Sequence, residues 1–247
     1  MKCTCTPLIC VVFFLSTIGV IAETPPNPAT TRIVEERYPD GTLKVWGRVE
    51  ECPDGTRKRT GEWTFWFPDG TIKAQGQYRA GESGGPDGIT GLPLNGREGL
   101  WIFWHPNGQK RQEAVYSGGR KNGPFKSWSE NGGEEAEGAY LDDQKDGRWV
   151  IWWESGRQRF RGHFLRGRET GRVRFWHENG QPAVQGTFRD GIREGAFTYW
   201  HPSGMKMAAG DFKNGKKDGR WIEWDADGKM LRAASYSEGR LIGEKTF

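Results

Sequence analysis

The amino-acid sequence predicts an all-β protein, an elongated antiparallel β-meander built from tandem 24-residue β-hairpin repeats. A tryptophan recurs with a period of 24 residues, and a fixed period of this length indicates a repeat architecture. Glycine-containing turn sequences also punctuate each repeat twice, as expected for hairpins. The tryptophans of this period are Trp104, Trp128, Trp152, Trp176, Trp200 and Trp224, and Trp66 holds the same position one insertion earlier; together they are called the column tryptophans below.

The N-terminal segment predicts export. Residues 1–22 contain Lys2 and then an apolar stretch from Leu8 to Ala22, which is too short to span a bilayer. Residues 23–31 are polar and rich in proline, so we expect them to form a linker. This pattern predicts a signal peptide that is cleaved near Ala22, and hence a periplasmic or secreted protein. An uncleaved membrane anchor is the alternative.

The remaining chain divides into a cap and an array. Residues 32–60 contain a degenerate repeat that we expect to cap the N-terminal end, and residues 61–247 contain seven hairpin repeats. A Gly/Pro-rich insertion at residues 82–98 interrupts the array, and such insertions form surface loops, either on a binding face or without function. After loss of the signal peptide, Cys52 is the remaining cysteine, so no intramolecular disulfide is expected. Each repeat starts at a glycine, the repeat glycine: Gly61, Gly99, Gly123, Gly147, Gly171, Gly195 or Gly219.

Two kinds of turn sequence alternate along the array. Within a repeat, Pro68-Asp69-Gly70 is typical of a three-residue hairpin loop, in which a type I turn precedes a left-handed glycine. Between repeats, Asn122-Gly123, Asp146-Gly147 and Asp218-Gly219 are short-range hairpin signals. Each repeat should therefore contain two turns and two short strands, which are rich in aromatic and β-branched residues.

The loop length predicts which side chains share a face. With a three-residue loop, Trp152 should lie opposite Gln158, on an apolar face with Phe160, Gly162 and Phe164. The column tryptophans would then be structural residues that pack in the protein interior. A two-residue loop would exchange the two faces, because side chains alternate along a strand.

The other face is expected to carry a candidate binding surface. It should bring indoles against arginines of the neighbouring strand, and such pairs stack a guanidinium on a ring. The functional interpretation is an anion site for a polysaccharide, a lipid headgroup or an acidic protein. The alternative is that the acidic stretch 123–146 complements the arginines beside it, with a solvated face. The predicted surface comprises Trp149, Trp153, Arg157, Arg159 and Arg161, with the pairs Trp149–Arg161, Ile151–Arg159 and Trp153–Arg157.

No catalytic, cofactor-binding or metal-ligating residue is predicted. His105, His177 and His201 share one position of the repeat, but equivalent residues of successive repeats lie two strands apart, about 9.6 Å, which is wide for ligands of one zinc ion. The nucleophile-elbow and Walker patterns do not occur. The net charge of +4 is too small to indicate nucleic-acid binding. We expect a protein that is not an enzyme, the alternative being an active site in residues 82–98.

The repeat columns resemble a known family. Gly-x-Trp-x-x-Trp, Asn/Asp-Gly, Gly-x-Tyr/Phe and Asn-Gly-Lys are similar to the MORN repeat, and more closely to its bacterial variant, which is found in proteins often labelled antitoxin components. Residues 195–200, 210–212 and 214–219 show the pattern best, and the resemblance covers about residues 32–247. It implies protein–protein scaffolding and, for some arrays, contact with acidic lipids. The antitoxin label implies a cytoplasmic partner.

The expected function is that of an exported, non-enzymatic repeat scaffold, which presents an extended β surface to a protein or an envelope component. One alternative is a glycan- or cell-wall-binding module that uses exposed tryptophan and arginine. A second alternative is an antitoxin-like protein that binds a partner. We expect an unknown protein or envelope polymer as the partner, membrane contact that is at most peripheral, and either a monomer or an edge-to-edge oligomer.

Overall fold

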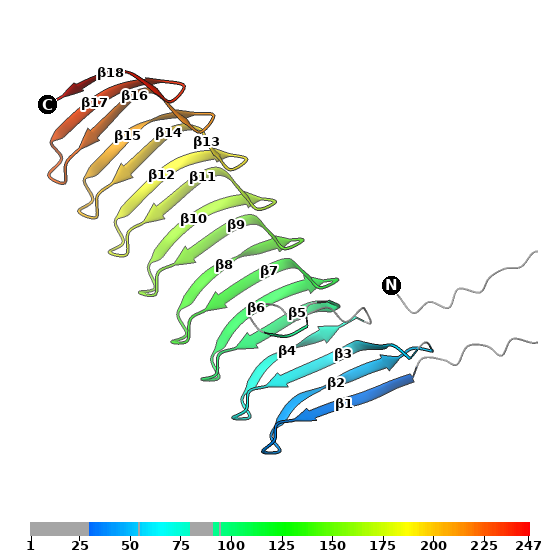
Figure 1. Cartoon of the computed structure of the whole chain (residues 1–247). Helices are drawn as coiled ribbons and strands as arrows, with labels where there is room; N and C mark the ends of the chain where they lie inside the picture. Colours follow the sequence, from blue (N-terminus) through cyan, green and yellow to red (C-terminus); the bar gives the residue numbers. More distant parts are fainter. Residues whose placement is uncertain (1–29, 54, 80–90, 94) are drawn as a thin grey trace, which may run out of the picture. The chain divides into compact units, whose positions relative to one another are not determined.

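The computed structural model describes residues 30–53, 55–79, 91–93 and 95–247 (Figure 1). The predicted signal peptide, its cleavage site near Ala22 and the linker up to residue 29 lie outside the described residues, as do residues 82–90 and 94 of the insertion. The described residues form two compact units. Module 1 comprises the chain up to Trp101 together with residues 117–119, and module 2 comprises residues 102–116 and 120–247.

The described residues contain 18 β-strands and no helix. Module 1 holds β1 (Thr30–Arg37), β2 (Leu43–Glu51), β3 (Arg57–Trp66) and β4 (Ile72–Tyr78), and the module boundary falls within β5 (Arg97–Trp104). Most of β6 and all later strands belong to module 2: β6 (Lys110–Ser117), β7 (Arg120–Trp128), β8 (Glu134–Leu141), β9 (Gln144–Trp152), β10 (Gln158–Leu165), β11 (Arg168–Trp176), β12 (Pro182–Arg189), β13 (Ile192–Arg193), β14 (Gly195–Trp200), β15 (Lys206–Lys213), β16 (Lys216–Trp224), β17 (Met230–Ser237) and β18 (Arg240–Thr246).

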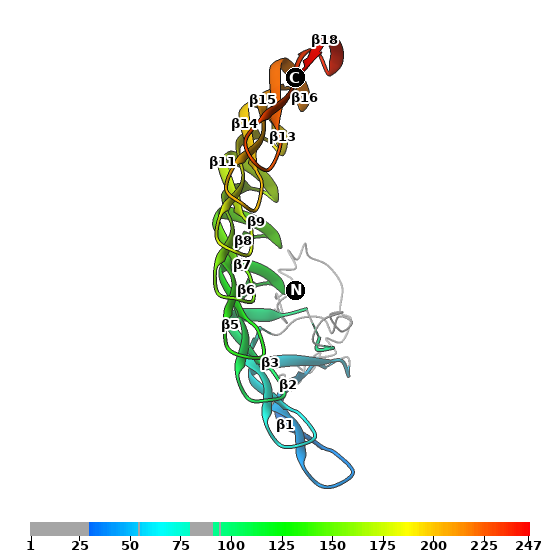
Figure 2. The same cartoon turned by 90° about the vertical axis from the view of Figure 1, so that its left-hand side faces the viewer.

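The strands pair antiparallel in the order of the chain. In module 1, β1 pairs with β2, β2 with β3 and β3 with β4. In module 2, each strand from β7 to β12 pairs with the next, β12 pairs with both β13 and β14, and each strand from β14 to β18 pairs with the next. Figure 2 shows module 2 edge-on as a single layer of strands. The predicted all-β antiparallel meander of tandem hairpins is confirmed.

The loop within each repeat has the predicted three residues. The Trp153 backbone N–H donates to the Arg157 carbonyl at 2.8 Å, and the Gly156 N–H donates to the Trp153 carbonyl at 2.9 Å. Gly156 has a φ of +78°, the left-handed conformation that closes a type I turn in such loops. As predicted, Trp152 lies opposite Gln158.

The turn between repeats lies earlier in the chain than predicted. Arg166 and Gly167 have φ values of +49° and +80°, so these two residues form a type I′ turn. The predicted turns at Asn122-Gly123, Asp146-Gly147 and Asp218-Gly219 are therefore wrong, because these residues lie inside β7, β9 and β16. There the glycine supplies a bulge: Glu137 pairs with Val150 and Ala139 with Asp146, so β9 carries two extra residues.

A second bulge exchanges the predicted faces. Beyond the Trp152–Gln158 pair, Phe160 lies opposite Ile151, so Arg159 is an extra residue on β10. As a result, Trp149 lies opposite Gly162 rather than opposite Arg161. The predicted pairs of Trp149 with Arg161 and of Ile151 with Arg159 are wrong, although the loop length was right. The same irregularity follows the loop of five other repeats, at Trp66, Trp128, Trp176, Trp200 and Trp224.

The largest buried rings of the core lie two positions after the repeat glycines, on what we call the inner face. Trp101, Trp149 and Trp221 are 0%, 1% and 2% exposed. By contrast, the column tryptophans lie half-buried on the opposite, outer face, which corrects the expectation that they form the apolar face. The core column comprises Trp63, Trp101, Phe125, Trp149, Val173, Phe197 and Trp221, and all seven are buried.

A second column of rings packs between the core residues. The Tyr140 ring lies 5.1 Å from that of Phe125 and 5.0 Å from that of Trp149, nearly perpendicular to both. In module 1, Tyr78 lies in the same way between Trp63 and Trp101, at 5.8 and 4.9 Å. Edge-to-face pairs are favourable because the positive edge of one ring meets the negative face of the next. Each repeat is thereby joined to its neighbour.

Candidate functional site

The structure rearranges the predicted binding surface. Trp149 is buried on the inner face and is not available to a partner. Trp153 is half-buried, and its indole N–H donates to the Trp176 carbonyl at 3.0 Å. The guanidinium over its ring, at 4.6 Å, belongs to Arg159. Arg157, its predicted partner, instead donates to the Glu178 carbonyl at 3.2 Å. Trp153 and Arg157 therefore tie one loop to the next.

The exposed arginines near this position come together on the outer face of β9, β10 and β11. Arg161 lies directly opposite Arg174, its partner across the β10–β11 pair. On the other side of β10, His163 lies opposite Arg148. The Arg161–Arg174 pair is destabilising, because it places like charges directly opposite each other in a sheet. We call the exposed side chains of Arg148, Arg161, Arg172 and Arg174 the arginine face.

The acidic stretch beside the arginine face does not neutralise it. Among the described residues, no ion pair joins residues 123–146 to any of the four arginines of this face. The acidic stretch instead makes a contact of its own, between Lys126 and Glu137 at 3.4 Å. The arginine face thus remains a concentration of positive charge in solvent.

The histidines that share one repeat position form a ladder between loops. The Nε2 atoms of His105, His177 and His201 lie 2.7, 2.9 and 3.1 Å from the carbonyl oxygens of Trp128, Trp200 and Trp224. Each of these carbonyls belongs to the column tryptophan of the following repeat. Within the described part of the chain, no group of three His, Cys, Asp or Glu residues could hold a metal ion.

A column of cations covers the rings of the inner face, and sequence reasoning missed it. The Lys145 ammonium lies 4.5 Å from the Trp149 ring and 5.2 Å from the Phe164 ring. Burial lowers the pKa of Lys145, and the nearby charge of Glu169 acts in the opposite direction. The signal in the sequence is a basic residue two positions before the repeat glycine, at Arg59, Arg97, Lys121, Lys145, Arg193 and Lys217. In the repeat that has Val173 instead of a ring, this position is Glu169.

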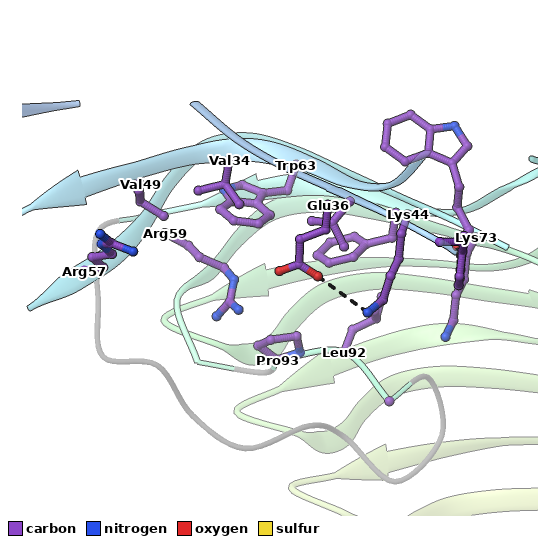
Figure 3. A pocket seen from close by; sticks show the side chains of 15 residues that line it. Val34, Glu36, Lys44, Val49, Arg57, Arg59, Trp63, Lys73, Leu92 and Pro93 are labelled. Carbon is purple, nitrogen blue, oxygen red and sulfur yellow. Dashed lines mark hydrogen bonds and ion pairs between the residues drawn. The ribbon is translucent and has the colours of Figure 1, made fainter. Parts of the chain in front are cut away.

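A groove of about 460 Å³ lies on the inner face of module 1 (Figure 3). Its apolar lining comes from β1, β2 and β3 and from two residues that follow the undescribed part of the insertion, Leu92 and Pro93. The Pro93 carbonyl accepts a hydrogen bond from the Tyr78 hydroxyl at 2.8 Å, and the Leu92 carbonyl accepts one from Arg97 at 3.2 Å. These bonds hold the second wall of the groove in place.

The groove has an excess of positive charge. Lys44, Arg57, Arg59 and Lys73 line it, against a single lining carboxylate, that of Glu36. Lys44 is paired with Glu36 at 3.5 Å, and Arg57 with Glu51 at 3.3 Å. Arg59 and Lys73 make no ion pair with the residues that the structure describes.

Arg59 is fixed in the groove by rings. Its guanidinium lies 5.1 Å from the centre of the Trp63 ring and 5.8 Å from that of Tyr78. The Arg59 Nε atom is buried and has no hydrogen-bond partner. A buried donor without a partner is costly, because it has lost its hydrogen bonds to water. Arg59 is therefore a rigidly held cation with an unused donor at an apolar groove.

Comparison with known proteins confirms the predicted resemblance. Four segments match the model of the MORN repeat variant: residues 59–80, 97–117, 169–190 and 217–238. Each match begins two residues before a repeat glycine, so all four matches start at the same position of the repeat. No curated protein matches the chain.

Among solved structures, the chain is similar to a chain of the "Crystal Structure of TcdB2-TccC3-TEV". The two are 11% identical, the TM-score is 0.23, and the match covers 83% of this chain and 14% of that chain. The present chain thus spans a small part of the longer protein, and the likeness carries no argument about function. Within the described residues, no helix long and apolar enough to cross a membrane is found.

Proposed function

Because this chain carries repeats of the MORN variant family, we propose that it is an exported, non-enzymatic repeat scaffold that binds a protein or another envelope component through its extended β surface. The arginine face is the part of the surface that makes the contact. The partner is an unknown protein or envelope polymer with anionic groups, and any membrane contact is peripheral.

The observation that carries this proposal is the pairing of Arg161 with Arg174. Two arginines directly opposite each other repel, and no carboxylate of the described residues relieves them. An anionic group of a partner, placed between the two guanidiniums, would form charge-assisted hydrogen bonds with both. Binding then removes a repulsion that the free protein tolerates.

The repeated residues support a scaffold rather than an enzyme. The inner column packs as a core, the cations lie over its rings, and the histidine ladder joins the loops. Each column therefore has a part in packing one repeat against the next. In an array of this kind, stability is a sum of contacts between neighbours.

The test is affinity capture from a native envelope fraction with the protein immobilised. The wild type is expected to retain a specific partner, and the double variant Arg161→Gln/Arg174→Gln is expected to lose it. The matched control is Arg189→Gln/Arg240→Gln, which removes the same charge from exposed positions elsewhere in module 2. Equal capture by the two double variants would contradict the arginine face as the contact.

Export is tested on its own by cell fractionation and N-terminal sequencing. A chain that begins near residue 23 in the periplasm or medium supports it. Recovery of the full-length chain in the cytoplasm would instead support the antitoxin-like alternative, in which the partner is cytoplasmic.

A glycan ligand is the second candidate, because the column tryptophans share the outer face with the arginines. Trp152 and Trp176 are half-buried there, so part of each indole is open to a ligand, and aromatic faces stack well on sugars. Titration with an anionic polysaccharide, polygalacturonate, should change the tryptophan fluorescence, whereas neutral dextran serves as the comparison. An unchanged tryptophan spectrum with both polysaccharides would exclude a glycan ligand.

A further inference from the structure

We propose that the groove of module 1 binds a small organic anion with an apolar body, and that Arg59 holds the anionic group. This site is separate from the arginine face, which lies on the outer face of module 2. The proposal is therefore independent of the proposed scaffold function, and either one can fail without the other.

The dimensions of the groove suit a small molecule. Its volume of about 460 Å³ falls within the range of roughly 300–1,000 Å³ that is typical of small-ligand sites. Figure 3 shows Leu92 and Pro93 across the groove from Val34 and Trp63. Because walls bound it on both sides, the groove favours a compact ligand over an extended chain that continues past it.

The floor of the groove would contact the apolar body. Val45, Val49, Trp63 and Phe65 are buried residues of the inner face, and Leu92 is a buried residue of the opposite wall. An aliphatic or aromatic body placed between these walls would remove apolar surface from water, which is favourable.

The charges of the groove select an anion. Lys44 and Arg57 already have carboxylate partners, so the cations left for a ligand are Arg59 and Lys73. Arg59 is the anchor, because it lines the groove and the rings of Trp63 and Tyr78 fix its orientation. The planar guanidinium of Arg59 lines the groove, and the N–H groups of a guanidinium match the oxygens of a carboxylate or sulfonate.

The repeat itself provides a matched control. Arg193 occupies the same position of its repeat as Arg59, two residues before the repeat glycine, and lies over the Phe197 and Phe212 rings at 6.0 and 5.1 Å. Arg193 has the ring contact of Arg59 but not its groove. Loss of either arginine removes a cation from over two rings, whereas loss of Arg59 alone should affect binding.

The experiment uses 8-anilinonaphthalene-1-sulfonate, an aromatic anion whose fluorescence rises in apolar sites, and N-phenyl-1-naphthylamine, which has the same body without the sulfonate. The wild type should bind the anion saturably, at one site per chain. Arg59→Gln should weaken that binding about tenfold, as expected for a lost charge-assisted contact. The variant should leave the affinity for the neutral probe unchanged.

Three results would overturn the proposal. The first is equal loss of anion binding in Arg59→Gln and Arg193→Gln. The second is equal wild-type affinity for the charged and neutral probes. The third is Arg59-dependent displacement of the anion by a hexaglutamate peptide, which would assign the groove to an acidic peptide. Unchanged near-ultraviolet circular dichroism of Arg59→Gln would separate lost binding from lost folding.

Discussion

The indole of Trp149 lies against the backbone of Gly138, so closely that a Cβ on the glycine would come within 2.4 Å of the ring. The same indole donates its N–H to the Ala139 carbonyl at 3.0 Å. This carbonyl lies beside the bulge of β9, where the regular ladder between β8 and β9 is interrupted. Trp101 on Gly76 and Trp221 on Gly210 repeat the arrangement, with 2.3 Å to the ring in each case.

The contact between Gly138 and Trp149 predicts that Gly138→Ala is destabilising. The new methyl group would have to displace a buried ring, and overpacking of this kind costs about 1–3 kcal/mol of unfolding free energy. The measurement is the urea midpoint of the variant. Gly243→Ala is the control, because a Cβ there meets nothing within 4 Å. If both variants unfolded at the wild-type midpoint, the ring would not be fixed against the glycine.

The two tryptophan columns predict unequal costs of truncation. Trp149→Ala removes a fully buried ring and should cost about 3–5 kcal/mol. Trp152→Ala removes a half-buried ring from the outer face and should cost clearly less. Urea denaturation of the two variants tests this order. The sequence alone suggested that Trp152 is the core residue, so a larger loss in Trp152→Ala would restore that assignment.

Strand content, repeat length and the three-residue loop could be predicted, because each depends on residues close together in the chain. The faces could not. Side chains alternate between the two faces of a strand, but this alternation predicts the faces across a hairpin only while the pairing is regular. The single extra residue Arg159 exchanges the faces of the residues that follow it on β10. Nothing in the residue types around Arg159 marks a bulge, since the glycine that usually marks one lies in the preceding loop.

The Asp-Gly and Asn-Gly pairs at the repeat glycines predict turns that do not form, for a related reason. A glycine with positive φ serves a type I′ turn and a bulge equally well, and Gly147 supplies the bulge. The true turn at Asp142-Asp143 contains no glycine. The groove of module 1 depends on residues 92–93 approaching β1 to β3, a long-range contact that no local pattern predicts.

The turn before β4 predicts a pKa shift that depends on one hydroxyl. The Thr71 hydroxyl and backbone N–H donate to Asp69 at 2.6 and 2.9 Å, and they lower the pKa of that carboxyl below 3.8. A lowered pKa stabilises the folded state above pH 3.8, and this contribution is lost as the pH falls through the folded value. In Thr71→Val, the pKa of Asp69 should rise towards 3.8, measured by NMR titration of the carboxyl carbon.

Asp40 provides the internal control for this titration. Hydrogen bonds from Thr42 lower the pKa of Asp40, and the backbone N–H of Thr42 is the largest cause. The substitution at Thr71 does not remove these hydrogen bonds. Asp40 should therefore titrate identically in both proteins. An Asp69 pKa that does not move in Thr71→Val would show that the hydroxyl is not its main cause.

The histidine ladder predicts that loop-to-loop hydrogen bonds stabilise the array. His177→Ala removes the contact with the Trp200 carbonyl and should cost about 0.5–1.5 kcal/mol, the usual net value of one hydrogen bond. His163→Ala is the matched control, since His163 is exposed on the outer face and should change the stability little. Thermal or urea unfolding distinguishes the two. Equal effects would mean that the histidine position is occupied for reasons other than this bond. Each repeat contacts only its neighbours, so the costs of His105→Ala and His177→Ala, which lie in repeats that do not adjoin, should add in the double variant.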